Sequence, residues 1–140
     1  MKKITVLYLS TKYTKTTNLK TFILNYKKFK SGIKHQLVIC LKNLDLRELE
    51  NRKKLLKKIE HIEYIDPSQE NDHEWGSIAR VSKKFNPSIF FYINDYSYPI
   101  KNNWLKIISS KYKKKELLAV LLLFQAGLQI HITESIKIII

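Results

Sequence analysis

Residues 88–93 limit the folds open to this chain more than any other stretch. They read Ser-Ile-Phe-Phe-Tyr-Ile, so both faces of a strand formed here are apolar apart from Ser88. Such a strand belongs at the centre of a sheet that helices cover on both sides. We therefore expect an α/β fold in which this stretch is buried.

Strand-like and helix-like stretches alternate along the chain. The expected strands are residues 4–9, 36–41, 61–65 and 88–93. Apolar residues at helical spacing predict helices over residues 19–29, 45–59, 77–85 and 102–113. Helices of about 10–15 residues between strands imply right-handed crossovers and a mostly parallel sheet. The sequence thus predicts an α/β fold of the Rossmann-like, three-layer sandwich type with a mostly parallel central sheet.

The helix expected over residues 45–59 carries the clearest local signals. Asp45 and Glu48 have the spacing of a capping box at its start. The apolar residues expected to face the core are Leu46, Leu49, Leu56 and Ile59. The charged residues of the other face are most simply a solvated surface: Arg47, Glu50, Arg52, Lys53, Lys54, Lys57 and Lys58. For the helix before it, Thr17 or Asn18 is the expected N-cap.

The chain is strongly basic, with a net charge of +14 from 26 Lys and Arg against 12 Asp and Glu. A field of this sign attracts nucleic acid, acidic lipid or a phosphorylated small molecule. Lys greatly outnumbers Arg. Because the planar guanidinium of Arg forms paired hydrogen bonds with phosphates and base edges, nucleic acid is the least favoured of these three partners. Peripheral contact with an anionic membrane surface stays open.

The single cysteine, Cys40, lies in an apolar run and is expected to be a buried strand thiol. A chain with one cysteine forms no internal disulfide, which fits a reducing compartment. We therefore expect a cytoplasmic location, with peripheral attachment to the inner membrane as the open alternative.

Residues 117–133 carry no formal charge, and their second half alternates between apolar and polar residues. This alternation predicts a half-buried strand, because a membrane span needs about 20 apolar residues. A tail anchor is the alternative interpretation. We divide the chain into an α/β domain over residues 1–115 and an apolar C-terminal tail over residues 116–140.

Ligands of open α/β sheets bind outside the carboxyl ends of the strands. Three loops are expected at those ends: residues 10–17, 66–76 and 94–101. The first offers hydroxyl groups, including those of Ser10 and Thr11, that could hold a nucleotide. It lacks the glycine spacing of a dinucleotide fingerprint or a P-loop, which disfavours a dehydrogenase or a P-loop ATPase.

The third loop carries a resemblance to a known family. Residues 91–99 read Phe-Tyr-Ile-Asn-Asp-Tyr-Ser-Tyr-Pro, and Asn-Trp-Leu follows at residues 103–105. Upstream, residues 75–80 read Trp-Gly-Ser-Ile-Ala-Arg. In order and spacing these segments resemble family-two glycosyltransferases of the GT-A fold, and above all a divergent group of bacterial surface-polysaccharide transferases. The likeness covers about residues 2–112.

The resemblance implies a domain that binds a nucleotide-diphospho-sugar between the first and the third of these loops, which then face one crevice. The residues that it places around the donor are Ser10, Thr11, Asp66, Arg80, Asn94, Asp95 and Ser97. It also implies that Asp95 binds Mg²⁺ or Mn²⁺, which would neutralise the leaving diphosphate. Tyr96 and Ser97 stand where a second Asp is expected, so either phosphate oxygens supply most of the ligands or basic residues replace the metal.

Enzymes of this family are longer than this chain, and their acceptor-binding region and catalytic base lie on segments without a counterpart here. Inverting transfer needs a carboxylate near the acceptor hydroxyl, and after Tyr112 the acids are Glu116 and Glu134. We therefore expect a truncated domain that is inactive alone, unless a second chain supplies the acceptor half. The alternative is a non-catalytic basic α/β module that binds an anionic membrane, a protein partner or nucleic acid.

Overall fold

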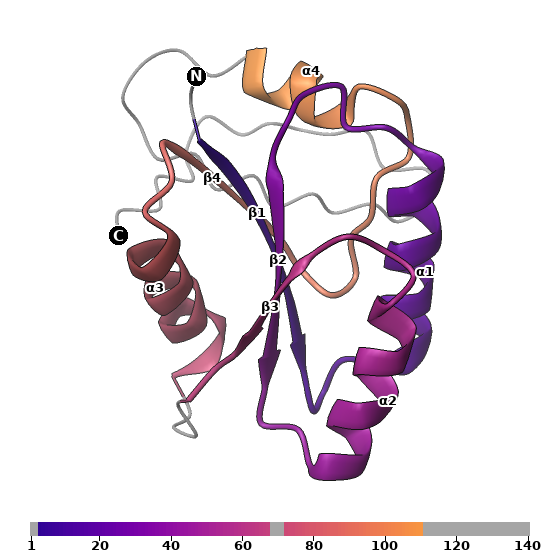
Figure 1. Ribbon diagram of the computed structural model, residues 1–140, viewed down its shortest axis with the longest axis vertical. Helices are drawn as coiled ribbons and strands as arrows, with labels where there is room; N and C mark the ends of the chain where they lie inside the picture. Colours follow the sequence, from indigo (N-terminus) through magenta and orange to yellow (C-terminus); the bar gives the residue numbers. More distant parts are fainter. Residues whose placement is uncertain (1–2, 68–71, 111–140) are drawn as a thin grey trace.

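The computed structural model describes residues 3–67 and 72–110 and shows a sheet between layers of helices (Figure 1). The strands are β1 (Ile4–Thr11), β2 (Gln36–Lys42), β3 (Ile62–Ile65) and β4 (Ile89–Ile93). The helices are α1 (Thr16–Lys28), α2 (Leu46–Leu56), α3 (His73–Phe85) and α4 (Trp104–Ser110). The predicted alternation is confirmed over these residues. The strand expected within residues 117–133 and the division between residues 115 and 116 lie outside them.

The four strands form one sheet in the order β3-β2-β1-β4, and every pairing is parallel. β1 is an inner strand, in which Leu7 lies opposite Val38 of β2 and Tyr92 of β4. This α/β layout is compatible with a Rossmann-like fold and confirms the predicted parallel sheet. Within the part of the chain that the structure describes, β4 is an edge strand rather than the predicted central one, although all its residues are buried.

Helices cover both faces of the sheet because crossovers between parallel strands are right-handed and the chain reverses its direction across the sheet after β3. The chain steps from β1 to β2 to β3 through α1 and α2 on one face, then returns to β4 through α3 on the other (Figure 1). Alternate residues of β1 serve the two cores: Val6 and Tyr8 pack on the α1 and α2 side, Leu7 and Leu9 on the α3 side. Tyr8 stacks on Phe22 of α1, with the ring centroids 4.1 Å apart. The sheet is thus the middle of three layers.

Cys40 of β2 is buried on the α3 side of the sheet, as predicted. Burial raises the pKa of its thiol to about 12, and the negative charge of Asp66 adds to this shift. Because the thiolate is the reactive form of cysteine, this side chain is inert near neutral pH. Cys40 is therefore a packing residue.

The predicted beginnings of α1 and α3 are wrong. α1 begins at Thr16 after an extended Lys15, and no side chain caps it, so Thr17 and Asn18 already lie within the first turn. α3 begins at His73, ahead of the predicted residue 77. No helix within the described residues has the length and apolar character that a membrane crossing needs.

The start of α2 is predicted correctly, but two of its side chains lie elsewhere than expected. The capping box is present, since the Asp45 side chain accepts a hydrogen bond from the Glu48 amide and the Glu48 side chain accepts one from the Asp45 amide. Leu46, the first residue of α2, is 81% exposed and belongs to neither core. Arg52, predicted to be solvated, is only 4% exposed. Its guanidinium points to the loop after β1, where it finds hydrogen-bond acceptors.

His35 lies just before β2 in a cluster with Tyr26 and Trp104. The Tyr26 hydroxyl is 2.6 Å from His35 Nε2, and His35 Nδ1 is 3.1 Å from the carbonyl oxygen of Ile33. Both contacts are hydrogen bonds when Nδ1 carries the proton and Nε2 accepts from Tyr26. Burial lowers the pKa of His35, although the bond to Ile33 opposes the shift. The neutral ring is therefore the form that the fold favours.

We predict that the protein loses stability as the pH falls below about 6.5, the ordinary pKa of histidine. The folded-state pKa of His35 is the lower one, so the unfolded chain takes up the proton first. The stabilisation is complete above that pH and is lost as the pH falls towards the folded-state pKa. Urea unfolding at several pH values measures it. The dependence should weaken in His35→Phe and persist in His61→Phe; an unchanged slope in His35→Phe contradicts the prediction.

Candidate functional site

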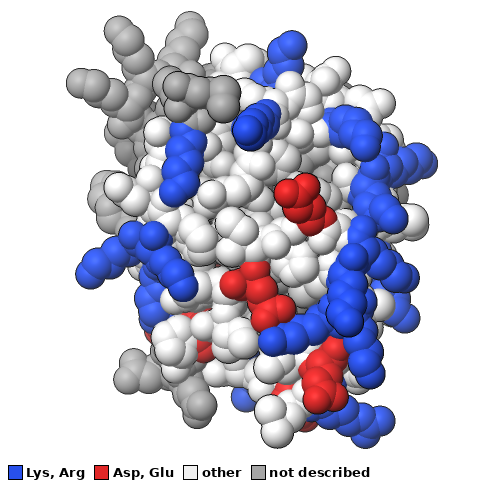
Figure 2. Space-filling view, in the orientation of Figure 1, with Lys and Arg blue, Asp and Glu red and all other residues white. Residues whose placement is uncertain are grey.

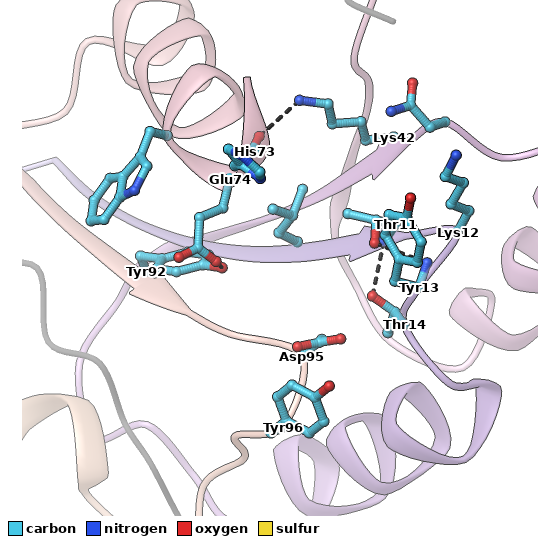
Figure 3. A pocket seen from close by; sticks show the side chains of 13 residues that line it. Thr11, Lys12, Tyr13, Thr14, Lys42, His73, Glu74, Tyr92, Asp95 and Tyr96 are labelled. Carbon is cyan, nitrogen blue, oxygen red and sulfur yellow. Dashed lines mark hydrogen bonds between the residues drawn. The ribbon is translucent and has the colours of Figure 1, made fainter. Parts of the chain in front are cut away.

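A pocket opens at the carboxyl edge of the sheet, between the loop after β1 and the loop after β4 (Figure 3). The strand order reverses between these two strands, and open α/β sheets bind their ligands at such a switch point. The pocket has a volume of about 450 Å³. It is lined by Leu9 and Thr11 of β1, residues 12–14 after β1, Lys42 at the end of β2, Asn43 after it, residues 73–75 of α3, and Tyr92, Asp95 and Tyr96 around the end of β4.

A buried arginine of α2 holds the loop after β1. Arg52 Nη1 donates to Ser10 Oγ at 2.6 Å, and Arg52 Nη2 donates to the Thr14 carbonyl oxygen at 2.8 Å. Within the loop, the Thr11 amide donates to Thr14 Oγ1 at 2.9 Å, and the Thr14 amide donates to the Thr11 carbonyl oxygen at 3.0 Å. Arg52 thereby fixes the part of the loop that faces the pocket.

Asp95 follows β4 in a turn that Asn94 closes. Asn94 Oδ1 accepts hydrogen bonds from the Tyr96 amide at 3.1 Å and from Ser97 Oγ at 2.6 Å. The Tyr8 hydroxyl donates to the Asp95 carbonyl oxygen at 3.3 Å, which ties the turn to β1. The Asp95 carboxylate faces the pocket (Figure 3).

The surroundings of Asp95 favour a ligand that offers positive charge or hydrogen-bond donors. Burial raises the pKa of its carboxyl group, and the nearby Glu74 carboxylate raises it further. A hydrogen bond with Thr14 and the positive charge of Arg52 act in the opposite direction. A bound donor group would stabilise the charged carboxylate in this setting.

Ion pairs hold the start of α3 against the ends of β2 and β3. Asp66, buried after β3, accepts hydrogen bonds from Arg80 Nε and Nη2, both at 2.8 Å, and from the Ser77 hydroxyl. Asp72 accepts one from Arg80 Nη1 at 2.7 Å and pairs with the buried ammonium of Lys42. The hydrogen bonds from Arg80 and Lys42 hold the pKa of Asp72 well below its usual range. This network explains why α3 begins earlier than predicted.

Gly76 allows the Asp72 carboxylate to lie along α3. A Cβ atom at position 76 would lie 1.8 Å from Asp72 Oδ2, so any other residue would displace that carboxylate. With the start of the helix fixed in this way, Glu74 and Trp75 reach the pocket. Tyr92 of β4 donates to Glu74 Oε2 at 2.8 Å and joins this wall to the sheet.

The structure brings Thr11 and Asp95 together in the pocket. This confirms the expectation that the loops after the first and fourth strands face one crevice. The other residues predicted around a donor are not among the lining residues, and each bonds within the protein: Ser10 with Arg52, Asp66 with Arg80, and Asn94 with Ser97. In this structure they shape the loops and the start of α3.

The sequence did not predict that Arg52 supports the loop after β1. It also did not predict that Glu74 and three exposed aromatic residues line the pocket. Tyr13 is 78% exposed, Trp75 52% and Tyr96 64%, and all three line the pocket. Large aromatic rings that stay exposed beside a polar cavity are typical of ligand-binding surfaces. One indication for Tyr13 and Tyr96 was present in the sequence: each lies in a loop that follows the carboxyl end of a predicted strand, where ligands of such sheets bind.

The pocket combines two kinds of polar group. Lys12 and the hydroxyl group of Thr11 come from the loop after β1 and the end of that strand, and the carboxylates of Glu74 and Asp95 come from α3 and the loop after β4. The first set suits phosphate oxygens, and the second suits hydroxyl donors. In residues 3–67 and 72–110 no group of three or more His, Cys, Asp or Glu is placed to hold a metal ion. No family model, curated protein or solved structure matches this chain.

Proposed function

We propose that this chain is a glycosyltransferase-like domain that binds a nucleotide-diphospho-sugar for surface polysaccharide synthesis. One observation carries the proposal: Thr11 and Asp95, which the sequence resemblance assigns to the donor, line the same pocket at the switch point of a parallel sheet. The volume of about 450 Å³ lies within the range of about 300–1,000 Å³ for small-molecule pockets. A GT-A-like arrangement of the domain is part of this proposal.

Each part of such a donor finds a suitable chemical partner in the pocket. A base or a sugar ring can stack on the exposed rings of Tyr13 and Tyr96. The carboxylates of Glu74 and Asp95 can accept hydrogen bonds from ribose or sugar hydroxyls. Lys12 supplies a positive charge for the diphosphate. The pocket thus suits a ligand that carries an anionic group, hydroxyl groups and a flat ring together.

A divalent cation, Mg²⁺ or Mn²⁺, enters the proposal as a companion of the diphosphate. Mg²⁺ in nucleotide sites is often held by one or two carboxylates together with phosphate oxygens and water. Asp95 is the candidate protein ligand. Because the described residues contain no preformed cluster of three ligands, the donor itself would have to supply most of the coordination.

We predict that a UDP- or GDP-linked sugar raises the thermal unfolding temperature of the protein. A ligand at about 100 times its dissociation constant adds about 2.7 kcal/mol to the free energy of unfolding. Asp95→Ala should lose most of this stabilisation, because a hydrogen bond to a charged group contributes about 1.5–3 kcal/mol. Thermal scans with a panel of nucleotide sugars, with added Mg²⁺ or Mn²⁺ and with EDTA, provide the measurement.

Glu50→Ala is the matched control, because Glu50 is an exposed carboxylate of α2 away from the pocket. It removes the same charge and should keep the full ligand-induced shift. Equal shifts in the two variants would place the ligand elsewhere, and no shift with any nucleotide sugar would refute the proposal. A shift that EDTA leaves unchanged would show that donor binding needs no metal.

A further inference from the structure

The outward side of α1 and α2 forms a strongly basic surface, which we call the basic face. Figure 2 shows Lys and Arg gathered along the side of the molecule on which these two helices lie in Figure 1. Its members are the exposed residues Lys20, Lys27 and Lys28 of α1, Arg47 and Lys54 of α2, and Lys57 and Lys58 directly after α2.

Helical periodicity creates this surface. α1 buries Leu19, Phe22 and Ile23, and α2 buries Arg52 and Leu56. Partly buried residues of the same helices pack beside them, so the exposed charged positions face outward; these are basic except for Glu50 of α2. No member of the basic face takes part in an ion pair with another described residue. Its positive charge is therefore available to a partner.

Two leucines are exposed on the same two helices. Leu24 is 68% exposed and Leu46 is 81% exposed. Leu24 lies one helical turn from Lys20 and one from Lys28, so ammonium groups flank it on both sides. A single exposed leucine is ordinary, but one flanked by lysines can reach below the level of the headgroups while the ammonium groups stay at that level.

We propose that the basic face docks the protein on an anionic membrane surface. Lysine stems can lie along the interface while their charged ends stay at the level of the phosphates, and Leu24 can enter the acyl region. A nucleic-acid partner is less well matched, because arginine is the better fork for phosphates and Arg47 is the one arginine among the members of this face. The lining of the pocket includes no residue of α1 or α2, so the inference does not depend on the proposed donor.

Sedimentation of the full chain with lipid vesicles tests the inference. We expect binding to vesicles of phosphatidylcholine mixed with an equal amount of phosphatidylglycerol, and little binding to phosphatidylcholine alone. Raising the salt from about 0.1 M to about 1 M shortens the screening length from about 10 Å to about 3 Å and should release most of the protein. Lys54→Gln, Lys57→Gln and Lys58→Gln together should weaken binding roughly a hundredfold, because each lysine near an anionic surface contributes about fivefold.

The control removes the same charge from other elements by combining Lys83→Gln, Lys101→Gln and Lys106→Gln, all at exposed positions. It should bind the anionic vesicles at least ten times more tightly than the triple variant at Lys54, Lys57 and Lys58. Equal loss in both triple variants would mean that net charge alone attracts the membrane and would overturn the assignment to this face. Equal binding to both kinds of vesicle, or binding to single-stranded RNA but to no vesicle, would overturn it as well. Leu24→Ser should further weaken binding to anionic vesicles.

Discussion

Replacing Asp66 by alanine is expected to lower the free energy of unfolding by about 3 kcal/mol, because the hydrogen bonds of this buried carboxylate with a partly exposed arginine are lost and bonds to a charged group contribute about 1.5–3 kcal/mol. The Asp66 side chain is fully buried, and it accepts hydrogen bonds from the Arg80 guanidinium and the Ser77 hydroxyl. Without it, the buried Ser77 hydroxyl loses its acceptor, and Arg80 loses two hydrogen bonds while its bond to Asp72 stays. Urea unfolding followed by circular dichroism measures the loss.

Glu63→Ala provides the matched control for Asp66→Ala. Glu63 pairs with Lys53 at 2.7 Å, but both side chains are partly exposed, and exposed pairs contribute only about 0–1 kcal/mol. The contrast between the two variants isolates the effect of burial. If the two variants are equally stable, the network around Asp66 does not hold the start of α3 as described.

Arg52→Met is expected to cost about 2–4 kcal/mol of stability and to loosen the loop after β1. Arg52 makes two hydrogen bonds, to Ser10 Oγ and to the Thr14 carbonyl oxygen, and a bond to a charged group contributes about 1.5–3 kcal/mol. The variant also removes the cost of burying a cation, which offsets part of the loss. Urea unfolding gives the stability, and hydrogen exchange at the amides of Thr11 and Thr14 reports on the loop.

Arg47→Met on the same helix is the control for Arg52→Met. Arg47 is exposed, so its replacement should change stability by no more than about 0.5 kcal/mol and leave the amide exchange of the loop unaltered. Unchanged protection of the Thr14 amide in Arg52→Met would show that the loop keeps its shape without the arginine.

The fold was largely predictable because its signals are local. Within the apolar stretch at residues 88–93, Ile89–Ile93 forms β4 and all five residues are buried. The Asp45 and Glu48 pair begins α2 as its spacing requires. The edge position of β4 in the described sheet was not predictable. An apolar strand predicts that helices cover both faces of the sheet at that strand. It does not predict how many strands pair with it, because an edge strand can be covered on both faces as well.

The site was less predictable because it depends on contacts between distant segments. Arg52 lies three residues from Leu49 and four from Leu56, so it occupies the inward stripe of α2. Its charge suggested a solvated position, and its acceptors, Ser10 and the Thr14 carbonyl oxygen, belong to a different part of the chain. A charged residue within the apolar stripe of a helix can therefore be buried, provided that another segment supplies a hydrogen-bond partner.

The same reasoning applies to the residues that the resemblance assigned to the donor. Asp66 and Arg80 follow the family pattern in the sequence, yet here they bond to each other. Their pairing depends on how α3 lies against the end of β3, which no local pattern specifies. Asp95, by contrast, directly follows a strong strand signal, and its place at the carboxyl edge of the sheet was predictable.

A nuclear magnetic resonance titration of the full chain with UDP- and GDP-linked sugars tests most directly whether the pocket between the loops after β1 and β4 binds a nucleotide sugar. The proposal predicts that the largest shifts of backbone amide signals occur at residues 11–14 and at Asp95 and Tyr96. It also predicts that Asp95→Ala removes most of them at the same ligand concentration. Shifts confined to the lysines of α1 and α2, or no shifts with any of these ligands, would contradict it.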